Sequence, residues 1–369
     1  MKRLLCILSG MNAGGAETFL MKLYRQIDRE TVQMDFCINV KEKCFYEDEI
    51  LSLGGKIYRI PAKSENVKEY RKRLFEVVKE GGYKNVLRIT SNAAGFLDLK
   101  IAKKAGAEVC CARSSNSSDG GGLISFLAHR FGRMLYGRAV DVKIAPSDLA
   151  AIYTFGKKAY KSGEVTVLRN GLDTEKFSYS DAARKEVRRE FGIAEDAFVA
   201  GHVGRFEAQK NHGFLLDAFA EMKKQNPASV LLLVGKGARE EEMKKKAEAL
   251  LPPGSVVFAG ERRDVPRLLS AMDAFVFPSL YEGMPNTVLE AQTNGLICTV
   301  SDAITKEANV TGKVRFLSLS SSPAAWASEV LSQRSACREN AGQIMRERGY
   351  DIAATARAFV QTVFPAENG

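Results

Sequence analysis

The chain has 369 residues, of which 45% are apolar and 27% charged, and a net charge of +10 at neutral pH. This length predicts two domains with a core each, and the composition excludes a disordered or fibrous protein. The seven cysteines contain no C-x-x-C pair, which argues against a disulfide framework or a zinc site and favours a cytoplasmic location. No apolar segment is long enough to cross a bilayer, and the run at 4–8 is too short for a signal peptide.

The positive charge is concentrated in the first half of the chain. Residues 1–170 contain 29 Lys and Arg against 18 Asp and Glu, an excess of +11, whereas the remainder contains 25 against 26. Such asymmetry suggests contact with an anionic surface, for which an acidic membrane leaflet and nucleic acid are both candidates. A basic surface that is merely solvated is an equally good interpretation.

Short apolar runs alternate with helical stretches through the first half. Gly14 and Gly15 follow the first predicted strand and open a helix with Glu17 in its first turn. Glycines at such a turn let the backbone approach a ligand and expose helix-start amides, although a tight turn without a ligand explains them equally well. We expect strands over 4–8, 34–40, 56–60, 85–89, 108–112 and 142–145, and helices over 17–27, 65–80, 95–105 and 125–139.

A polar, glycine-rich loop follows the fifth predicted strand of this half. It begins near Arg113, Ser114 and Asn116 and runs to Gly122. Because ligands of parallel sheets bind beyond the carboxyl ends of the strands, this loop is a candidate binding segment. The turn signal Asn170-Gly171 then marks the expected domain boundary, with 1–169 before it.

The second half repeats the scheme, with strands over 198–203, 230–234, 256–258, 274–277 and 297–300. Strand–helix alternation twice over predicts an α/β protein with two Rossmann-like, doubly wound domains that face a cleft. We expect the second domain over 170–349 and helices over 213–225, 238–250, 265–271, 286–294 and 323–331.

The loop after the first strand of the second domain carries two cations, Arg205 and Lys210. A guanidinium fork suits paired phosphate oxygens, and an ammonium adds a movable point charge, so both side chains can reach a diphosphate from one loop. They could also neutralise a leaving diphosphate without a metal ion. A pair of surface cations is the alternative, and the position at a strand end favours the binding role.

The segment 278–291 places two carboxylates, Glu282 and Glu290, eight residues apart around Gly283 and Pro285. It follows a buried strand, and Pro285 predicts the start of a helix. Glu282 would lie on the strand-to-helix turn, Glu290 one turn into the helix, and the free amides between them would form an anion site. This arrangement suits a sugar nucleotide, with amides for the diphosphate and carboxylates for hydroxyls.

Four motifs in this order match those of one enzyme family. They are a first-domain glycine turn, an Asn-Gly-x-Asp element closed by an aromatic residue, a Gly-Arg…Lys-Asn loop and a Glu-x7-Glu box. The matching residues are Gly14, Gly15, Glu17, Asn170, Gly171, Asp173, Phe177, Gly204, Arg205, Lys210, Asn211, Glu282 and Glu290. With them the chain resembles the retaining family-4 glycosyltransferases of GT-B architecture over nearly its whole length. Residues 297–317 are similar to the branch that builds bacterial exopolysaccharide or capsule.

The resemblance implies transfer of a sugar from a nucleotide-diphosphate donor, which we expect to be UDP-linked, to an acceptor hydroxyl with retained configuration. Arg205 and Lys210 would hold the diphosphate, Glu290 would bind the ribose hydroxyls, and Glu282 would face the donor sugar, with Glu282, Arg205 and Lys210 as the catalytic set. The fold requires no cofactor and no bound metal ion, and a C-terminal helix over 350–369 would cross back to the first domain. We expect further donor contacts from Gly15, Arg263, Gly283, Met284, Pro285, Asn286 and Thr287, and acceptor contacts from Gly14, Glu17, Arg113, Ser114 and Asn116.

Two positions depart from the family pattern. The loop after strand 108–112 has no histidine, and the usual Gly-x-Pro-Val is replaced by Gly295-Leu296-Ile297-Cys298. The missing histidine leaves a non-catalytic nucleotide-sugar-binding protein as one alternative, and a sugar-nucleotide epimerase or a phosphorylase on the same fold as another. The absence of a G-x-G-x-x-G motif disfavours a dinucleotide-dependent oxidoreductase.

Under this resemblance we expect a nucleotide sugar, a glycan or lipid-linked acceptor and an anionic membrane surface as partners, and no nucleic acid. The expected location is the cytoplasm, with the inner face of the cell membrane as the candidate surface.

Overall fold

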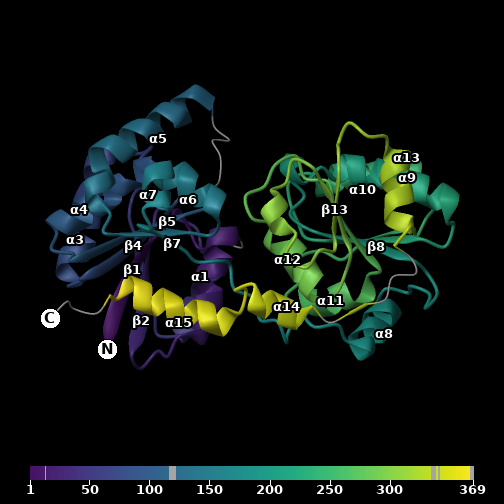
Figure 1. Ribbon diagram of the computed structural model, residues 1–369, viewed down its shortest axis with the longest axis horizontal. Helices are drawn as coiled ribbons and strands as arrows, with labels where there is room; N and C mark the ends of the chain where they lie inside the picture. Colours follow the sequence, from purple (N-terminus) through teal and green to yellow (C-terminus); the bar gives the residue numbers. More distant parts are fainter. Residues whose placement is uncertain (13, 116–121, 334–337, 340, 366–369) are drawn as a thin grey trace. The chain divides into compact units, whose positions relative to one another are not determined.

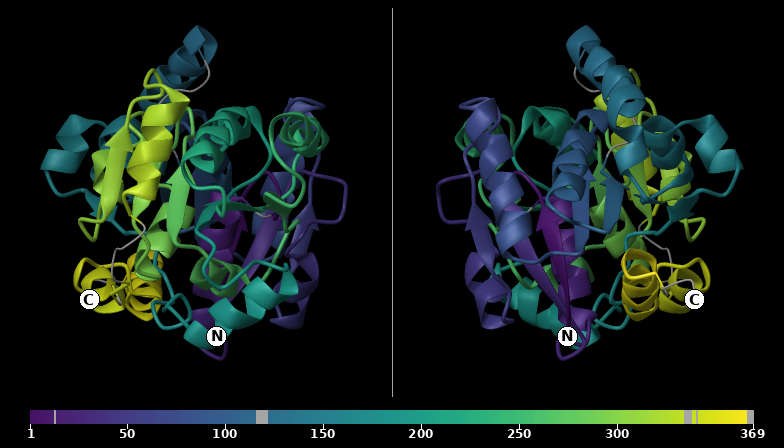
Figure 2. Two further views of the ribbon diagram at one scale, coloured as in Figure 1. Left: turned by 90° about the vertical axis from the view of Figure 1, so that its right-hand side faces the viewer. Right: turned by 90° about the vertical axis from the view of Figure 1, so that its left-hand side faces the viewer.

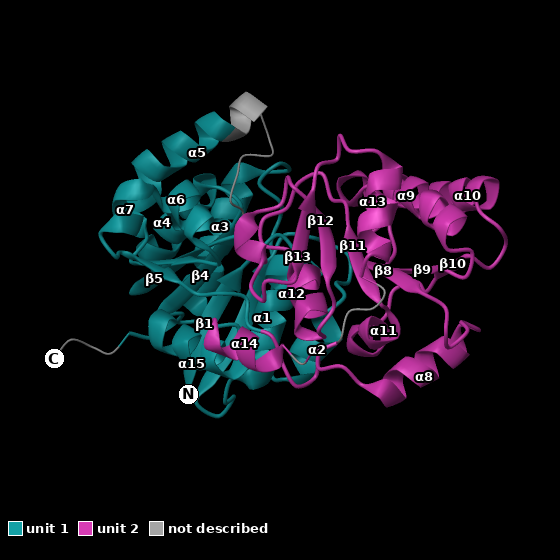
Figure 3. Ribbon diagram, turned by 45° about the vertical axis from the view of Figure 1, so that its right-hand side comes forward, with its two compact units in different colours: residues 1–171, 349–369 teal, residues 172–348 magenta. Residues whose placement is uncertain are grey.

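The computed structural model describes residues 1–12, 14–115, 122–333, 338–339 and 341–365, and it divides the chain into two compact units (Figure 3). Unit 1 comprises Met1–Gly171 and Gly349–Gly369, and unit 2 comprises Leu172–Arg348. The first boundary lies two residues after the predicted one, and the second lies one residue before it.

Unit 1 is built on a seven-stranded sheet in which every pairing is parallel. Its strands are β1 (Lys2–Ile7), β2 (Val32–Ile38), β3 (Ile57–Arg59), β4 (Asn85–Thr90), β5 (Val109–Ser114), β6 (Val142–Ala145) and β7 (Val165–Val167). They lie in the order β3-β2-β1-β4-β5-β6-β7 (Figure 1). The helices are α1 (Gly15–Gln26), α2 (Glu47–Ser52), α3 (Val67–Glu80), α4 (Phe96–Lys104), α5 (Gly122–Tyr136), α6 (Asp148–Phe155), α7 (Lys157–Lys161) and α15 (Ile352–Val363), with 3-10 turns at Ala93–Gly95 and Gly137–Ala139.

The first strand shows why both faces of this sheet are covered. Leu4 and Cys6 point into one core, which α1 and α15 complete, whereas Leu5 and Ile7 point into a second core with α3, α4 and α6. Successive side chains of a strand face opposite sides, so a continuous apolar run requires a helix layer on each side.

Unit 2 repeats the plan with six parallel strands. The strands are β8 (Val199–Val203), β9 (Val230–Val234), β10 (Val256–Phe258), β11 (Ala274–Phe277), β12 (Cys298–Ser301) and β13 (Val314–Leu317), in the order β10-β9-β8-β11-β12-β13. The helices are α8 (Asp181–Glu190), α9 (His212–Gln225), α10 (Glu240–Leu250), α11 (Val265–Ala271), α12 (Asn286–Thr293), α13 (Pro323–Leu331) and α14 (Gly342–Glu347), with 3-10 turns at Ala208–Lys210 and Lys306–Ala308.

The strand β9, which lies between β10 and β8, divides its side chains in the same way as β1. Leu232 and Val234 join the core with α8, α11 and α12, while Leu231 and Leu233 join the core with α9, α10 and α13. The predicted parallel sheets and the helices between their strands are confirmed in both units.

The elements that the sequence pattern did not predict are short or polar. The strands β7 and β13 lie at sheet edges and have only three and four residues. Helix α8 buries only Ala183, Val187 and Arg188, so it lacks the broad apolar stripe by which an amphipathic helix is recognised. Helices α2, α6, α7 and α14 have at most eight residues each.

The predicted return of the C-terminal helix to the first domain is confirmed. Phe359 of α15 meets Phe19 of α1 edge-on at 6.4 Å between ring centroids, inside the core of unit 1. Gly171 lies against this crossing, where a Cβ would approach the Cα of Ile352 to 2.7 Å. Glycine is therefore required at the end of the first segment of unit 1 because the returning chain passes too close for a side chain.

Candidate functional site

Two loops of unit 2 leave the sheet from neighbouring strands. The loop 204–211 follows β8, the loop 278–285 follows β11, and these strands pair in parallel through Phe275 and Gly201. Their carboxyl ends therefore lie at one edge of the sheet, where ligands of doubly wound folds bind. Two hydrogen bonds tie the loops together: the Leu280 N–H donates to the Gln209 carbonyl at 2.8 Å, and the Gln209 side-chain Nε2 donates to the Tyr281 carbonyl at 2.7 Å.

The predicted cation and carboxylate of these loops form an ion pair. Lys210 Nζ lies 2.6 Å from Glu282 Oε1, and the two side chains are only 16% and 12% exposed. The ammonium also lies 4.6 Å from the centre of the Phe277 ring. Burial and two partners hold Lys210 in one place, so the pair can present an ordered charge to a ligand at this edge.

The backbone beside Lys210 is held in an unusual conformation. Asn211 has φ 56, and it is the one non-glycine residue of the described chain in the left-handed region. Such a conformation costs roughly 1–3 kcal/mol and persists where its surroundings impose it. Here it turns the chain sharply from the Lys210 loop into α9, whose first residue is His212.

Two histidines lie beneath the loop. The ring of His202 meets that of His212 at 4.7 Å and stacks on Phe277 at 5.3 Å, while His212 stacks on Phe206 at 4.1 Å. His202 Nδ1 lies 2.8 Å from the Val276 carbonyl, so this nitrogen carries the hydrogen and donates. Both rings are buried and packed against aromatic side chains, so they support the loop from within unit 2.

Acid should destabilise unit 2 through His212. Burial, helped by Lys210 and Arg239, lowers the pKa of His212 to about 4, against about 6.5 for an unperturbed imidazole. Between these values the unfolded chain binds a proton that the folded chain does not. The stabilisation is therefore complete above pH ~6.5 and falls by ~3 kcal/mol as the pH drops to ~4. Burial also lowers the pKa of His202, which adds a loss of the same sign.

The variant His212→Phe keeps the stacking on Phe206 and removes the titrating group. Thermal unfolding between pH 4.5 and 7.5 should show a smaller loss of stability toward acid for this variant than for the wild type. Identical pH profiles would show that His212 does not carry the effect.

Glu290 lies in α12, one turn after the helix begins at Asn286, and it is 8% exposed. Helix α12 starts directly after the loop that carries Glu282, and no side chain caps its first turn. The predicted helix start at Pro285 is confirmed, since Pro285 occupies the N-cap position. The free amides of this start lie in the segment 283–287 that we expect to contact the donor.

Two other predicted donor residues of unit 2 are cations, one on the Lys210 loop and one after another strand. Arg205 is exposed on the Lys210 loop and forms no ion pair with any residue in the described ranges. Arg263 follows β10, which is separated from β11 by β9 and β8. The structure thus joins Lys210 to Glu282 directly, keeps Arg205 on the Lys210 loop, and places Arg263 after β10, two strands from β8.

The glycine turn of unit 1 has the expected position. Gly14 is the N-cap of α1, Gly15 is its first residue and is exposed, and Glu17 lies in the first turn. A Cβ on Gly14 would collide with the Glu17 carboxylate, which folds back over this backbone. A larger residue at 14 would therefore displace that flexible carboxylate, and the amides of the first turn remain without a side-chain cap.

Two of the predicted acceptor residues are buried inside unit 1. Arg113 donates to Asn170 Oδ1 at 2.6 Å and stacks over the Phe19 ring at 3.6 Å, and burial lowers its pKa to about 9. Ser114 shares a hydrogen bond of 2.6 Å with Thr154. As placed, both side chains contact neighbouring elements of unit 1 and face no solvent, whereas Asn116 lies outside the described residues.

Sequence reasoning missed two contributors to the Lys210 site and the backbone turn of a third residue, Asn211, which belongs to the matched loop motif. Phe277 supports the ammonium, Gln209 ties the two loops, and Asn211 supplies the left-handed turn. The signal for Asn211 was present, because asparagine tolerates that conformation better than most residues. Nothing local marked Phe277, whose role depends on β11 lying beside β8.

Comparison with known proteins places the chain among sugar-transferring enzymes. The family profile "Glycosyl transferases group 1" matches residues 183–335. EpsF of Bacillus subtilis (strain 168), whose name assigns it to the glycosyltransferases, is 35% identical over 371 residues, covering 97% of this chain and 95% of EpsF. The Escherichia coli enzyme named UDP-Gal:alpha-D-GlcNAc-diphosphoundecaprenol alpha-1,3-galactosyltransferase is 35% identical over 142 residues, 38% of this chain and 37% of that protein.

Solved structures share the fold. HepE of Anabaena, in complex with UDP and glucose, has a TM-score of 0.78 and 17% identity, covering 99% of this chain and 100% of that chain. WaaG, a glycosyltransferase involved in lipopolysaccharide biosynthesis, has a TM-score of 0.72 and 16% identity, covering 99% of this chain and 100% of WaaG. The predicted GT-B fold is thereby confirmed.

Proposed function

This chain belongs to the group 1 glycosyltransferases, and on that basis we propose that it moves a sugar from a UDP-linked donor to an acceptor hydroxyl with retained configuration. The acceptor is a glycan or a lipid-linked sugar, and the product is part of a cell-surface polysaccharide. The near full-length similarity to EpsF supports the enzyme class. The UDP complexes of HepE and the donor named for the Escherichia coli relative support a UDP-linked donor.

The buried Lys210–Glu282 pair carries the assignment of the donor site. As the bond between the sugar and the diphosphate breaks, negative charge grows on the departing diphosphate. Lys210 and exposed Arg205 lie on one loop and supply cations for that charge, without a metal ion. An ordered ammonium in a partly dry site stabilises such charge more strongly than one in water.

The carboxylates and amides of the second loop take the rest of the donor. Glu282, at the mouth of the loop, faces the transferred sugar, and Glu290 accepts hydrogen bonds from the ribose hydroxyls. The uncapped amides over 283–287 at the start of α12 contact the diphosphate.

We assign the acceptor to unit 1 at the exposed start of α1. Gly14, Gly15 and Glu17 line this turn, and buried Arg113 supports it from below through Phe19 of α1. This placement shifts the predicted acceptor contacts from Arg113 and Ser114 toward the glycine turn.

Binding of UDP should raise the melting temperature of the protein, whereas ADP and GDP should raise it less. At a concentration near 100 times Kd, a ligand specific for the folded state adds ~2.7 kcal/mol, or roughly 5–10 °C for a unit of this size. Differential scanning fluorimetry measures the shift. Equal or absent shifts for all three nucleotides would contradict a UDP-linked donor.

Transfer itself is tested by incubating the full chain with a panel of UDP-sugars and following acceptor-dependent release of UDP. NMR of the glycoside formed reports the anomeric configuration. An isomerised donor would indicate an epimerase, a sugar phosphate would indicate a phosphorylase, and tight donor binding without turnover would indicate a binding protein; each would overturn the proposal.

A further inference from the structure

We propose that Tyr281 and its neighbour Leu280 form an apolar platform on which the pyranose ring of a sugar packs. The inference rests on the proposed function because it places a sugar at the carboxyl edge of the unit 2 sheet. The loop 278–285 leaves that edge from β11, which lies between β8 and β12. Figure 2 shows the strands of unit 2 side by side, with β11, β12 and β13 in green to yellow-green. The platform therefore emerges from within the sheet edge that carries the candidate donor groups.

Tyr281 is the most exposed aromatic residue in the described part of the chain. It is 60% exposed, and Leu280 beside it is 45% exposed. In the described part of unit 2, the other markedly exposed large apolar residues are Leu250 on α10 and Ile344 on α14, and each stands alone. Single exposed apolar side chains are ordinary on a protein surface, whereas two neighbours beside a ligand-binding edge indicate a contact surface.

The backbone beneath the platform is held at three successive residues. The Leu280 N–H and the Tyr281 carbonyl both bond to Gln209, at 2.8 and 2.7 Å. Glu282 follows directly and forms the 2.6 Å pair with Lys210. A ligand that packs on such a platform orders little further structure, because the backbone is already fixed and a tyrosine has only two side-chain torsions.

The Tyr281 ring is available to a ligand. Within the described residues, its side chain makes no hydrogen bond, ion pair or ring contact. The aromatic rings below the loop differ, because Phe277 stacks on His202 and Phe206 stacks on His212. Tyr281 is thus the aromatic surface that this edge of unit 2 presents to solvent.

The chemistry around Tyr281 suits a sugar. A pyranose ring has an apolar face of C–H groups and a rim of hydroxyls, so it packs on an aromatic ring while its rim meets polar groups. Glu282 follows Tyr281 directly and supplies a carboxylate for such hydroxyls. Two side chains are far too small a surface for a protein partner, which needs roughly 800 Å². A nucleobase is also flat, but it is attached to the ribose, which we assign to Glu290.

Two sugars meet at this edge during transfer, one on the donor and one on the acceptor, and both have the same kind of ring face. The variant Tyr281→Ala should raise KM for the sugar that packs on the platform roughly 3- to 10-fold, the effect of one aromatic contact. We expect kcat to change much less, because the contact is equally strong in the bound substrate and in the transition state. Tyr281→Phe keeps the ring and should recover most of the loss.

Initial rates across donor and acceptor concentrations, and melting curves with UDP and with UDP-glucose, UDP-galactose and UDP-N-acetylglucosamine, separate the two sugars. If the donor sugar packs on Tyr281, Tyr281→Ala raises KM for the UDP-sugar and shrinks the melting shift that the UDP-sugar adds beyond UDP. If the acceptor sugar packs there, KM for the acceptor rises and both melting shifts stay unchanged. Either result supports the platform.

The matched control is Leu250→Ala, which removes a leucine that is 46% exposed on α10 and should behave like the wild type. All of these side chains are exposed, so the melting temperature without ligand should be the same for each protein. Equal KM values and shifts for Tyr281→Ala and Leu250→Ala would overturn the inference. So would an equal loss in Tyr281→Phe, which would assign the effect to the hydroxyl.

The shift with UDP alone separates a sugar from a nucleobase. Loss of that shift in Tyr281→Ala would mean that the base stacks on the ring, and the inference would be wrong. A wild type that binds UDP-sugars without transferring them would refute the proposed function and leave this inference to the melting shifts. In that case a UDP-sugar shift that Tyr281→Ala leaves intact would overturn it, and a reduced one would support it.

Discussion

Replacing Lys210 by alanine is expected to lower kcat/KM for sugar transfer roughly 30- to 1000-fold. The substitution removes a cation that is 16% exposed and held by Glu282 and Phe277, so water cannot replace it at little cost. Loss of one preorganised charge at a developing anion costs ~2–4 kcal/mol of transition-state stabilisation. Initial rates of acceptor-dependent UDP release across donor concentrations give the measurement.

The pair offers a sharper test through a double-mutant cycle. If Glu282 only positions Lys210, Glu282→Gln should lose little further activity in the Lys210→Ala background; if Glu282 contacts the donor sugar as proposed, a large loss should persist. Lys224→Ala is the control, because Lys224 forms an exposed pair of the same length with Glu221 on α9 and should leave kcat/KM unchanged. Undiminished transfer by a folded Lys210→Ala protein would remove the donor site assigned here.

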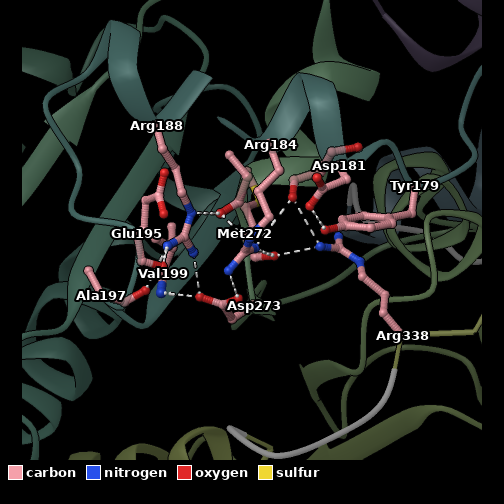
Figure 4. Close-up of polar contacts among 12 residues, drawn as sticks. Tyr179, Asp181, Arg184, Arg188, Glu195, Ala197, Val199, Met272, Asp273 and Arg338 are labelled. Atoms are coloured by element: carbon pink, nitrogen blue, oxygen red, sulfur yellow. Dashed lines mark hydrogen bonds and ion pairs between the residues drawn. The ribbon is translucent and has the colours of Figure 1, made fainter. Parts of the chain in front are cut away.

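Replacing Asp273 by alanine is expected to produce a large loss of stability in unit 2, ~3–5 kcal/mol. Figure 4 shows the network that depends on this carboxylate. Arg184 Nη2 and Arg188 Nη2 approach its two oxygens at 2.7 and 2.8 Å, and the Val199 N–H donates to it at 2.7 Å. Arg338 lies beside them, and burial with the nearby Arg184 charge lowers its pKa to about 10.

The arginines of this network also satisfy the C-terminal end of α11. Arg188 Nε donates to the Ala271 carbonyl at 3.2 Å, and Arg338 donates to the Leu269 and Met272 carbonyls at 2.7 and 2.8 Å. Cations are favourable at a helix C-terminus, where the last carbonyls have no intrahelical partner. Without Asp273, however, two close guanidinium groups lose the only carboxylate that they contact among the described residues. Leaving a buried charge unpaired costs more free energy of unfolding than the intact pair contributes.

Urea unfolding of the full chain, followed by circular dichroism, measures the loss for Asp273→Ala. Asp273→Asn should lose less, because its amide oxygen still accepts one hydrogen bond. The control Asp217→Ala breaks a half-exposed pair with Lys246, at 2.7 Å, and should cost no more than ~1 kcal/mol. Equal effects of Asp273→Ala and Asp217→Ala would mean that the arginine cluster does not depend on its carboxylate.

The donor loops illustrate what local pattern can reveal. Gly204 to Asn211 and Pro278 to Glu290 each follow an apolar run at a strand end, and both are polar segments that open a helix. Such chemistry is visible in a few adjacent residues, so the roles of Lys210 and Glu282 could be proposed together. Their contact at 2.6 Å could not be proposed with the same force, because it depends on β11 crossing to lie beside β8.

Unit 1 shows where local pattern fails. Arg113 and Ser114 follow a strand as binding residues often do, yet the structure buries both, against Asn170 and Thr154. Position 113 is 57 residues from its partner, so no local signal distinguishes a buried arginine from one that faces a ligand. The same limit applies to α5, which was predicted as a helix over 125–139 with no indication of the face that packs inward, a face that Gly132 and His129 occupy.

Alternating apolar runs, helix-start chemistry and the two loop motifs were therefore enough to establish two parallel α/β domains and to propose donor residues, since each depends on neighbours a few positions away. Only the folded chain decided the strand order, the return of α15 to unit 1 and the edge strands β7 and β13. It also decided that the Arg113 side chain points inward and that the apolar residues of α5 point outward. These features arise from contacts between residues far apart in the chain, and the energy of such contacts is set by packing and burial rather than by the order of the residues alone.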